Sequence, residues 1–192
     1  MKTIKLAIRQ FKYGIKNLIK WFPIIWKDRD WDYSFIFTIL ENKLKFQADY
    51  IGTKDRHVNA KKDAEVMMTC VRLIKLVKDE TYSSEYVDYH KTKYWFEPIE
   101  DKPGYSTLES QLQSENFDEY FKKYPLIYKR VLNGEGIMPL HNEFEDYAGF
   151  SEEEKEQSLK LRVALNISSI NHDRARKLLF KIIEQNIEKW WD

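Results

Sequence analysis

The sequence is poor in the residues that break helices and in the residues that cross-link chains. Its 192 residues include 6 glycines and 5 prolines, which is sparse for a many-turned β-sandwich and typical of a helical protein. The one cysteine, Cys70, cannot form a disulfide within the chain, so we expect a reducing compartment. No apolar run approaches the roughly 18 residues that a membrane span needs, so we expect no membrane span.

An uninterrupted apolar N-terminus is also missing. Lys5, Arg9, Lys12 and Lys16 interrupt the stretch that a secretory signal peptide would keep apolar. The net charge of +1 excludes a polyanion binder that uses its whole surface, and the 15% aromatic content excludes simple disorder. The length suits a domain that buries its own core without disulfides or structural metals. We therefore expect a single cytosolic domain over residues 1–192.

Apolar residues recur at threes and fours almost throughout, and no stretch alternates with period two for long enough to demand a strand. The predicted fold class is all-α, a single-domain multi-helix bundle of about 7–8 helices. A linker is expected at 97–106, where a domain break can occur, and an irregular acidic segment near 134–150. The expected helices span 3–22, 33–52, 55–79, 84–96, 107–123, 125–133, 151–169 and a last stretch from 171 or 173 onward.

Capping signals support several of these boundaries. The side chains of Asp32 and Ser84 can cap the first turn of a helix, and Ser151 with Glu154 has the spacing of a capping box. Pro125 suits the first turn of a helix, where its missing N–H is not needed. These signals predict where helices begin, independently of the apolar spacing.

Charged residues are divided unevenly along the chain. The first 27 residues carry only basic charged side chains, whereas 135–156 is mostly acidic. Two solvated helix faces are the simplest interpretation. The alternative is a pair of surfaces for opposite partners, or one end of the chain docking on the other in an oligomer.

The predicted first helix combines a basic face with an apolar face. Ile4, Ile8 and Phe11 begin the apolar face, and Pro23 should end or kink the helix. The width of the apolar face favours packing on a protein core. An anionic membrane surface and nucleic acid are the alternatives, and we favour neither.

The densest group of functional side chains is WKDRDWDY, residues 26–33. In a structural interpretation, Arg29 binds aspartates in a buried clasp that locks the first helix on the second. In a functional interpretation, the rings stack a purine, Arg29 binds phosphate and the aspartates accept from ribose hydroxyls. A divalent metal on the carboxylates is a weaker alternative, because the glycine and distal glutamate of a calcium loop are missing. The candidate ligand-binding residues are Trp26, Asp28, Arg29, Asp30, Trp31, Asp32, Tyr33 and Lys43.

This segment, continued as SFIFTILENKL, and the closing LLFKIIEQNIEKWWD resemble a recurrent group of small uncharacterised bacteriophage proteins with a W-x-DRDWDY motif and a C-terminal WWD. The resemblance covers about residues 18–95 and 160–192. It implies a phage origin and expression in the host bacterial cytoplasm, and it brings no activity with it. The residues that typify the group are Asp28, Arg29, Trp31, Asp32, Lys43, Leu44, Trp190, Trp191 and Asp192.

Enzyme patterns are incomplete. His172–Asp173 has the letters of a metal-binding doublet, but only Asp192 follows it as a further ligand. Two E-x-x-E/D pairs, 97–100 and 143–146, match the letters of magnesium-dependent nucleotide pyrophosphohydrolases in segments that do not suggest a helix. A Gly-rich phosphate loop, a G-x-S-x-G elbow and a cysteine pair for zinc are missing. We expect no cofactor and no metal, and a binding protein is favoured over an enzyme.

Two tryptophans, Trp190 and Trp191, stand where chain ends usually fray. They either pack within their own subunit or anchor an interface, and we expect a homo-oligomer, with a dimer favoured. The overall prediction is a phage accessory binding protein that acts on a host component without catalysis and sequesters a nucleotide immune signal. The alternatives are a metal-dependent nucleotide phosphohydrolase and a structural, oligomeric phage component.

Overall fold

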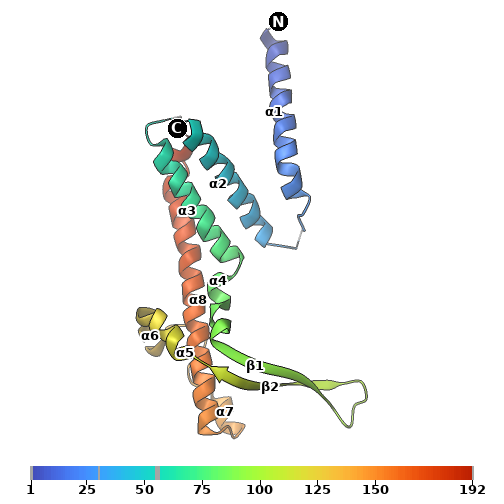
Figure 1. Ribbon diagram of the computed structural model, residues 1–192, viewed down its shortest axis with the longest axis vertical. Helices are drawn as coiled ribbons and strands as arrows, with labels where there is room; N and C mark the ends of the chain where they lie inside the picture. Colours follow the sequence, from blue (N-terminus) through green and yellow to red (C-terminus); the bar gives the residue numbers. More distant parts are fainter. Residues whose placement is uncertain (1, 30, 55–56, 192) are drawn as a thin grey trace. The chain divides into compact units, whose positions relative to one another are not determined.

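The computed structural model describes residues 2–29, 31–54 and 57–191 and is mostly helical, with one two-stranded sheet (Figure 1). The predicted helical fold class is confirmed. Among these residues, no helix is both long and apolar enough to span a membrane. In chain order the elements are α1 (Lys2–Ile25), α2 (Ser34–Lys54), α3 (Ala60–Lys78), α4 (Thr81–Ser84), η1 (Glu85–Tyr89), β1 (His90–Pro98), β2 (Ser106–Glu115), α5 (Phe117–Lys123), α6 (Pro125–Leu132), α7 (Glu143–Tyr147), α8 (Glu152–Asn186) and η2 (Lys189–Trp191).

The chain divides into two compact units. Unit 1 comprises Met1–Lys78 and Ile182–Asp192, and unit 2 comprises Asp79–Lys181. The stretch 97–106, predicted as a linker, lies inside unit 2 and holds the loop between β1 and β2. The turn residues in that stretch were identified correctly, but they reverse a strand and do not separate domains.

The helix pair α2 and α3 forms the centre of unit 1, with the two helices running antiparallel (Figure 1). Asp32 caps α2 as predicted, because its Oδ1 accepts a hydrogen bond from the Ser34 N–H at 2.9 Å. Gly52 lets the helices approach closely, since a Cβ there would lie 3.1 Å from Ala64 Cβ. The buried apolar residues of the pair are Leu44, Ala48, Ile51, Ala60, Met67, Cys70, Val71, Ile74 and Val77.

A buried carboxylate ties α2 to the end of α3. Glu41 accepts hydrogen bonds from Lys45 Nζ at 2.5 Å and from Lys78 Nζ at 2.7 Å. Burial alone would raise the pKa of Glu41, but the two ammonium groups outweigh burial and lower the pKa from its ordinary value. Glu41 is therefore an ionised, paired group, and removing one partner would leave part of its charge uncompensated.

Aromatic rings dominate the core of unit 2. α5, α6 and α8 each present one apolar face to this core, and the rings of Tyr86, Tyr89 and Tyr128 pack at its margin. α6 begins at Pro125, as predicted. The buried residues of this core are Phe117, Tyr120, Phe121, Ile127, Val131, Val163, Ala164 and Ile167.

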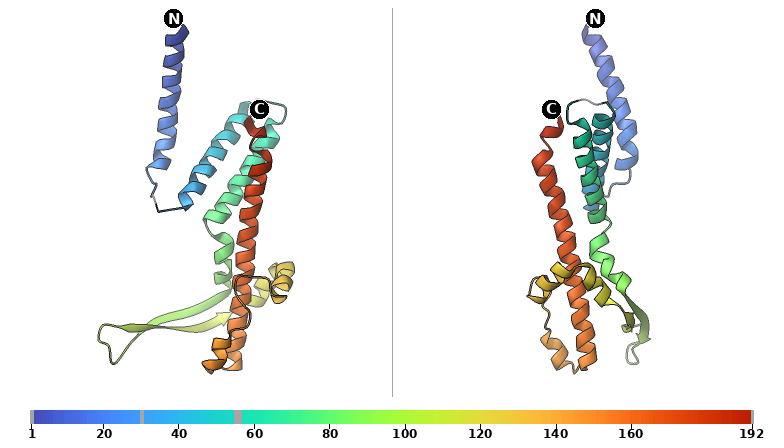
Figure 2. Two further views of the ribbon diagram at one scale, coloured as in Figure 1. Left: turned by 180° about the vertical axis from the view of Figure 1, so that it is seen from behind. Right: turned by 60° about the vertical axis from the view of Figure 1, so that its left-hand side comes forward.

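The helix predicted at 84–96 is wrong, and of the one predicted at 107–123 only the end, α5, is present. β1 and β2 occupy most of these residues and pair antiparallel, with His90 opposite Glu115 (Figure 2). Aromatic residues at 94–96 favour a strand. Most side chains of both strands are exposed, so no alternation of apolar and polar residues marks them in the sequence.

The capping and turn residues of this region also have roles that differ from those predicted. Ser84 ends α4 and does not cap a longer helix, because its hydroxyl donates to the Glu80 carbonyl oxygen at 2.9 Å. Pro103 and Gly104 form part of the hairpin loop, where Gly104 has a φ of 88°. A left-handed backbone of this kind favours glycine, which explains the loop at this point.

α8 is one continuous helix where two were predicted. The capping box at its start is confirmed: Ser151 Oγ accepts from the Glu154 N–H at 3.3 Å, and the Glu154 carboxylate accepts from the Ser151 N–H at 2.8 Å. Asn171 is buried within the helix, and Asp173 pairs with Arg176 at 2.7 Å. Neither residue caps a new helix, because the backbone continues through both.

One buried amide holds the irregular segment 134–142 on α8. Asn166 is 1% exposed, and its Oδ1 accepts from the Ile137 and Met138 N–H groups at 2.9 and 3.0 Å. Its Nδ2 donates to the Met138 carbonyl oxygen at 2.9 Å. Gly136 must lack a side chain, because a Cβ there would lie 2.4 Å from Asn166 Cγ. The segment is therefore fixed by polar contacts, although it has no regular structure over 134–142.

A second buried polar group joins α7 to α8. Arg162 Nη1 and Nη2 donate to the two oxygens of Glu145 at 2.5 and 3.1 Å, and Ser158 Oγ donates to the same carboxylate at 2.5 Å. These hydrogen bonds, those from Arg162 first, lower the pKa of Glu145 to about 2. The short helix α7 is thus attached through a charge pair.

We predict that Asn166→Ala destabilises the protein by about 2–4 kcal/mol, because two backbone N–H groups lose their acceptor in a buried place. Gln113→Ala, which truncates an exposed amide of the same unit, should change the free energy of unfolding by less than about 0.5 kcal/mol. Urea unfolding followed by circular dichroism measures both. Equal midpoints for the two variants would contradict the role of Asn166.

A second prediction concerns pH. Because the pKa of folded Glu145 is about 2, below the ordinary 4.5, its contribution to stability is fully present above pH 4.5 and is lost as the pH falls toward 2. Wild type should therefore lose Tm more steeply than Glu145→Gln over that interval. The exposed Glu119→Gln is the control and should keep the wild-type slope. Parallel curves for wild type and Glu145→Gln would contradict the assignment.

Candidate functional site

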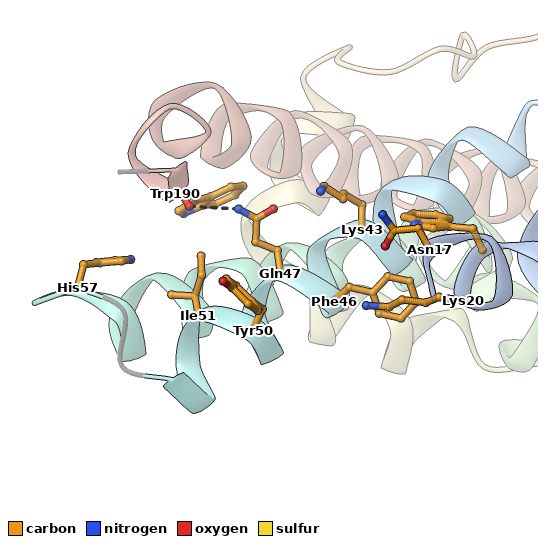
Figure 3. Close-up of a pocket in the computed structure, with 10 residues that line it drawn as sticks. Asn17, Lys20, Lys43, Phe46, Gln47, Tyr50, Ile51, His57 and Trp190 are labelled. Carbon is orange, nitrogen blue, oxygen red and sulfur yellow. Dashed lines mark hydrogen bonds between the residues drawn. The ribbon is translucent and has the colours of Figure 1, made fainter. Parts of the chain in front are cut away.

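Unit 1 contains a cavity of about 430 Å³ between α1, α2 and the C-terminal turn η2 (Figure 3). This volume is within the range of small-molecule sites, which run from roughly 300 to 1,000 Å³. The lining combines aromatic rings, amides and basic side chains. The residues are Asn17, Lys20, Trp21, Lys43, Phe46, Gln47, Tyr50, Ile51, His57 and Trp190.

The floor of the cavity is one face of α2. Lys43, Phe46, Gln47 and Tyr50 follow each other at spacings of three, one and three residues, which places them along one side of a helix. The capped start of α2 and its packing on α3 fix the direction of this face. The helix therefore presents a cation, an amide and two aromatic rings to the same space.

α1 forms a second wall with a shorter row of the same kind. Asn17, Lys20 and Trp21 lie on one side of this helix. The Trp21 ring meets the Phe46 ring edge-on, with centroids 5.4 Å apart, and Lys20 Nζ lies 3.5 Å from the centroid of the Phe46 ring. These ring contacts place the Lys20 ammonium group over an aromatic face at the cavity.

The C-terminal turn closes one end. Gln47 Nε2 donates to the Trp190 carbonyl oxygen at 3.1 Å, a contact between residues 143 positions apart (Figure 3). Trp190 is 3% exposed within its own chain. Of the two predicted alternatives for Trp190, the structure therefore shows the ring packed inside its own subunit, while the predicted homo-oligomer stays a prediction. The side chain of Trp191 lies outside the description.

Two polar atoms at the cavity are buried and lack a hydrogen-bond partner among the described residues. They are Trp190 Nε1, a donor, and His57 Nε2, which lies 3.8 Å from Asp63 Oδ2 and so beyond hydrogen-bond distance. Buried polar atoms are normally satisfied, and an unsatisfied one can mark a place where water, an ion or a ligand binds. The same holds for Tyr120 Oη, Asn171 Nδ2 and His172 Nδ1 in unit 2, so the two atoms at the cavity are not unique to it. Of the described residues that line the cavity, none is acidic. The arrangement suits an anionic, ring-containing ligand.

A second cavity, of about 680 Å³, lies in unit 2 between the hairpin and the start of α8. Its lining includes Glu153 and Glu154, and the Glu154 carboxylate is already occupied by the capping box. Carboxylates on the wall oppose an anionic ligand. The unit 1 cavity is therefore the better candidate for the chemistry that the sequence predicted.

The predicted ligand-binding residues are divided by the structure. Lys43 lines the cavity, whereas Trp26, Asp28, Arg29, Trp31, Asp32 and Tyr33 do not, and Asp30 is outside the described residues. Trp31 is 84% exposed, and the Trp26 ring packs on Phe22 of its own helix at 5.2 Å between centroids. Asp32 acts as a helix cap. The loop at 26–33 thus connects α1 to α2 and contributes none of its described side chains to the cavity.

The predicted buried clasp around Arg29 is wrong. Arg29 is exposed, and the hydrogen bond it makes runs from Nη1 to the carbonyl oxygen of the adjacent Asp28 at 2.9 Å. No ion pair joins Arg29 to a described aspartate. Of the two described aspartates nearby, Asp28 is exposed and Asp32 accepts a hydrogen bond from the Ser34 N–H.

The predicted enzyme patterns do not come together. Across residues 2–29, 31–54 and 57–191, no group of three His, Cys, Asp or Glu side chains is placed to hold a metal ion. Glu97 lies in β1, so the pair 97–100 does not share a helical face. Glu143 and Asp146 do lie together in the helix α7, within a segment predicted to be irregular, and Asp146 pairs with Lys155 at 2.9 Å. Cys70 is fully buried in α3, and burial raises the pKa of its thiol to about 11. The interpretation of Cys70 as a core residue is confirmed.

The sequence missed most of the cavity residues. Phe46, Gln47 and Tyr50 have the spacing of a single helix face, but nothing local distinguishes a face that lines a cavity from one that packs on a core. Lys20 and Trp21 lie in the predicted first helix, which was expected to pack on a core through its apolar face and not through these two residues. The tertiary contact that brings them to Phe46 depends on the turn at 26–33.

No protein-family model matches the chain, and no curated protein or solved structure is significantly similar to it.

We predict that the buried carboxylate in unit 1, and not Arg29, carries the charge pairing that matters for stability. Lys78→Met should cost about 1–3 kcal/mol, because Glu41 keeps Lys45 but loses its other partner. Arg29→Ala should change the free energy of unfolding by less than about 0.5 kcal/mol, as exposed positions usually do. Thermal unfolding of both variants measures the difference. If Arg29→Ala lowers the free energy of unfolding more than Lys78→Met does, this prediction is wrong and the buried clasp is supported.

Proposed function

We propose that the chain is a non-catalytic binding protein whose unit 1 cavity takes a phosphorylated small molecule with an aromatic ring, of which a nucleotide is the typical case. The observation that carries the proposal is the joint placement of Lys20 over Phe46 and of Lys43 on the next turn of α2. Lysine ammonium groups attract phosphate, and Trp21, Phe46 and Tyr50 offer ring faces for a base.

The polar walls support the same ligand class. The amides of Asn17 and Gln47 have donors and acceptors that can read the edge of a base, and the buried N–H of Trp190 is an unused donor at the cavity. A phosphate brings several acceptors to a site whose described wall has no carboxylate. The proposed ligand thus matches the charge, the rings and the unpaired donor.

The biological form of this proposal is a phage accessory protein that sequesters a nucleotide signal of its bacterial host. The phage context comes from the resemblance of the WKDRDWDY and WWD motifs, and the structure supports the ligand class alone. A metal-dependent hydrolase remains the alternative, and the fate of the bound molecule separates the two.

We predict that ATP, AMP or cyclic AMP binds to the full chain and that binding weakens at least about tenfold in Lys20→Met, because a charged hydrogen bond or ion pair to phosphate is removed. Lys12→Met is the matched control, since Lys12 lies on the same helix and does not line the cavity. Calorimetry measures the affinities, and mass spectrometry after denaturation identifies the released molecule.

Three outcomes decide the proposal. If the nucleotide is released intact and its affinity falls in Lys20→Met but not in Lys12→Met, the chain is a binding protein. A hydrolysed nucleotide replaces it with the enzyme alternative. No binding by any of the three nucleotides, or an equal loss in Lys12→Met, contradicts the assignment of the cavity.

A further inference from the structure

α1 has an apolar stripe that its own chain does not cover. Ile4, Ile8, Phe11, Ile15, Leu18 and Phe22 recur at spacings of four and three, which places them within an arc of about 80° on the helix. Each of the six is between 41% and 71% exposed. The expected packing of this face on a core is therefore wrong.

The face that α1 turns toward α2 is a different one. Lys20 and Trp21 contact Phe46, and Asn17 lies on the same side of the helix. At about 100° per residue, these three positions lie roughly opposite the apolar stripe. The packing of unit 1 therefore uses one side of α1 and leaves the apolar side uncovered by the described residues of that unit.

A row of cations runs parallel to the stripe. Lys5, Arg9, Lys12 and Lys16 follow spacings of four and three and occupy a second arc of about 60°. No acidic residue occurs in α1. A helix with an apolar arc beside an all-basic arc has the pattern of helices that lie in the surface of an anionic bilayer.

We propose that α1 docks on the surface of an anionic lipid bilayer, with the apolar stripe at the boundary between head groups and acyl chains. The lysine stems lie along the apolar arc while their ammonium groups reach the lipid phosphates. Trp26, exposed just after the helix, has the amphipathic ring that favours this interface. The helix lies on the membrane and does not cross it.

Charge decides against a second copy of this chain as the partner. The acidic segment 135–156 is the complement that another α1 would need. Most of its carboxylates, though not all, have basic or polar partners within their own unit, among them Glu135 with Arg130, Glu145 with Arg162, Asp146 with Lys155, Glu154 with Ser151, and Glu156 with Lys160. An external anionic surface therefore fits the basic row better.

The apolar stripe decides against nucleic acid. Phosphate backbones would neutralise the basic row but leave Ile8, Phe11 and Ile15 in water. A bilayer covers both arcs of α1 at once, since burial of the stripe and attraction of the cations act in the same place.

The test is flotation of the full chain with vesicles of phosphatidylcholine alone or mixed with phosphatidylglycerol, without nucleotide. We expect binding to the mixed vesicles, weakened by salt, and at least about tenfold weaker partitioning for the double variant Phe11→Ser with Ile15→Ser. Tyr13→Ser is the matched control, because Tyr13 is as exposed but lies outside both arcs. It should bind as wild type does.

Other results overturn the proposal. If the double variant and wild type partition equally onto the vesicles, the apolar stripe is not the binding surface. If the wild-type chain does not float with the mixed vesicles, an anionic bilayer is not the partner. A dimer in light scattering that the double variant abolishes, without flotation, assigns the stripe to a second copy. Circular dichroism confirms that each variant remains folded. The vesicle result does not depend on nucleotide binding, so the two proposals fail separately.

Discussion

The order of both units depends on buried polar side chains that are fully paired. Glu41, Glu145 and Asn166 each hold a segment that apolar packing alone leaves loosely placed: the end of α3, the short helix α7 and the irregular 134–142. The chain has a mean hydropathy of −0.64, so apolar area is limited. Where a buried polar group has its partners, it fixes one arrangement of the backbone, because every other arrangement leaves it unsatisfied.

The cavity of unit 1 departs from this rule. Trp190 Nε1 and His57 Nε2 are buried without a partner among the described residues, in a chain that elsewhere pairs its buried carboxylates. An unpaired donor costs stability unless something else binds it. Deviations from local consistency of this kind are expected at functional sites. Tyr120, Asn171 and His172 in unit 2 also keep a buried polar atom without a partner among the described residues. The basic and aromatic lining of the cavity, more than its unpaired atoms, is therefore the reason to place ligand binding there.

The parts of the fold that could be predicted from the sequence are those set by local signals, and the parts set by tertiary contacts were missed. Helices with a capping residue and an internal face were predictable, as Asp32 and the Ser151–Glu154 box show. The hairpin was not, because a ribbon exposed on both faces has no period-two pattern. The break at 171 was predicted wrongly, since Asn171 lies inside a helix whose continuity depends on tertiary burial.

The candidate site was harder than the fold. Lys43 was predicted as a ligand-binding residue and does line the cavity. The other predicted residues came from WKDRDWDY, because a dense group of charged and aromatic residues in the sequence suggests a binding site. In the structure, the cavity residues come from α1, α2, the start of the α3 region and the C-terminus. Residues from four segments come together only through tertiary contacts, and the spacing of apolar residues along the sequence does not predict such contacts.

α1 joins the two proposals through its faces. One side contacts Phe46 and completes the cavity, and the opposite side carries the uncovered stripe. If bilayer binding favours the position of α1 that forms the cavity, it raises the affinity of the cavity for its ligand. Ligand binding then raises the affinity of the chain for the bilayer by the same factor, because the two binding free energies are linked. The uncovered stripe and the cavity wall are thus opposite faces of the same helix.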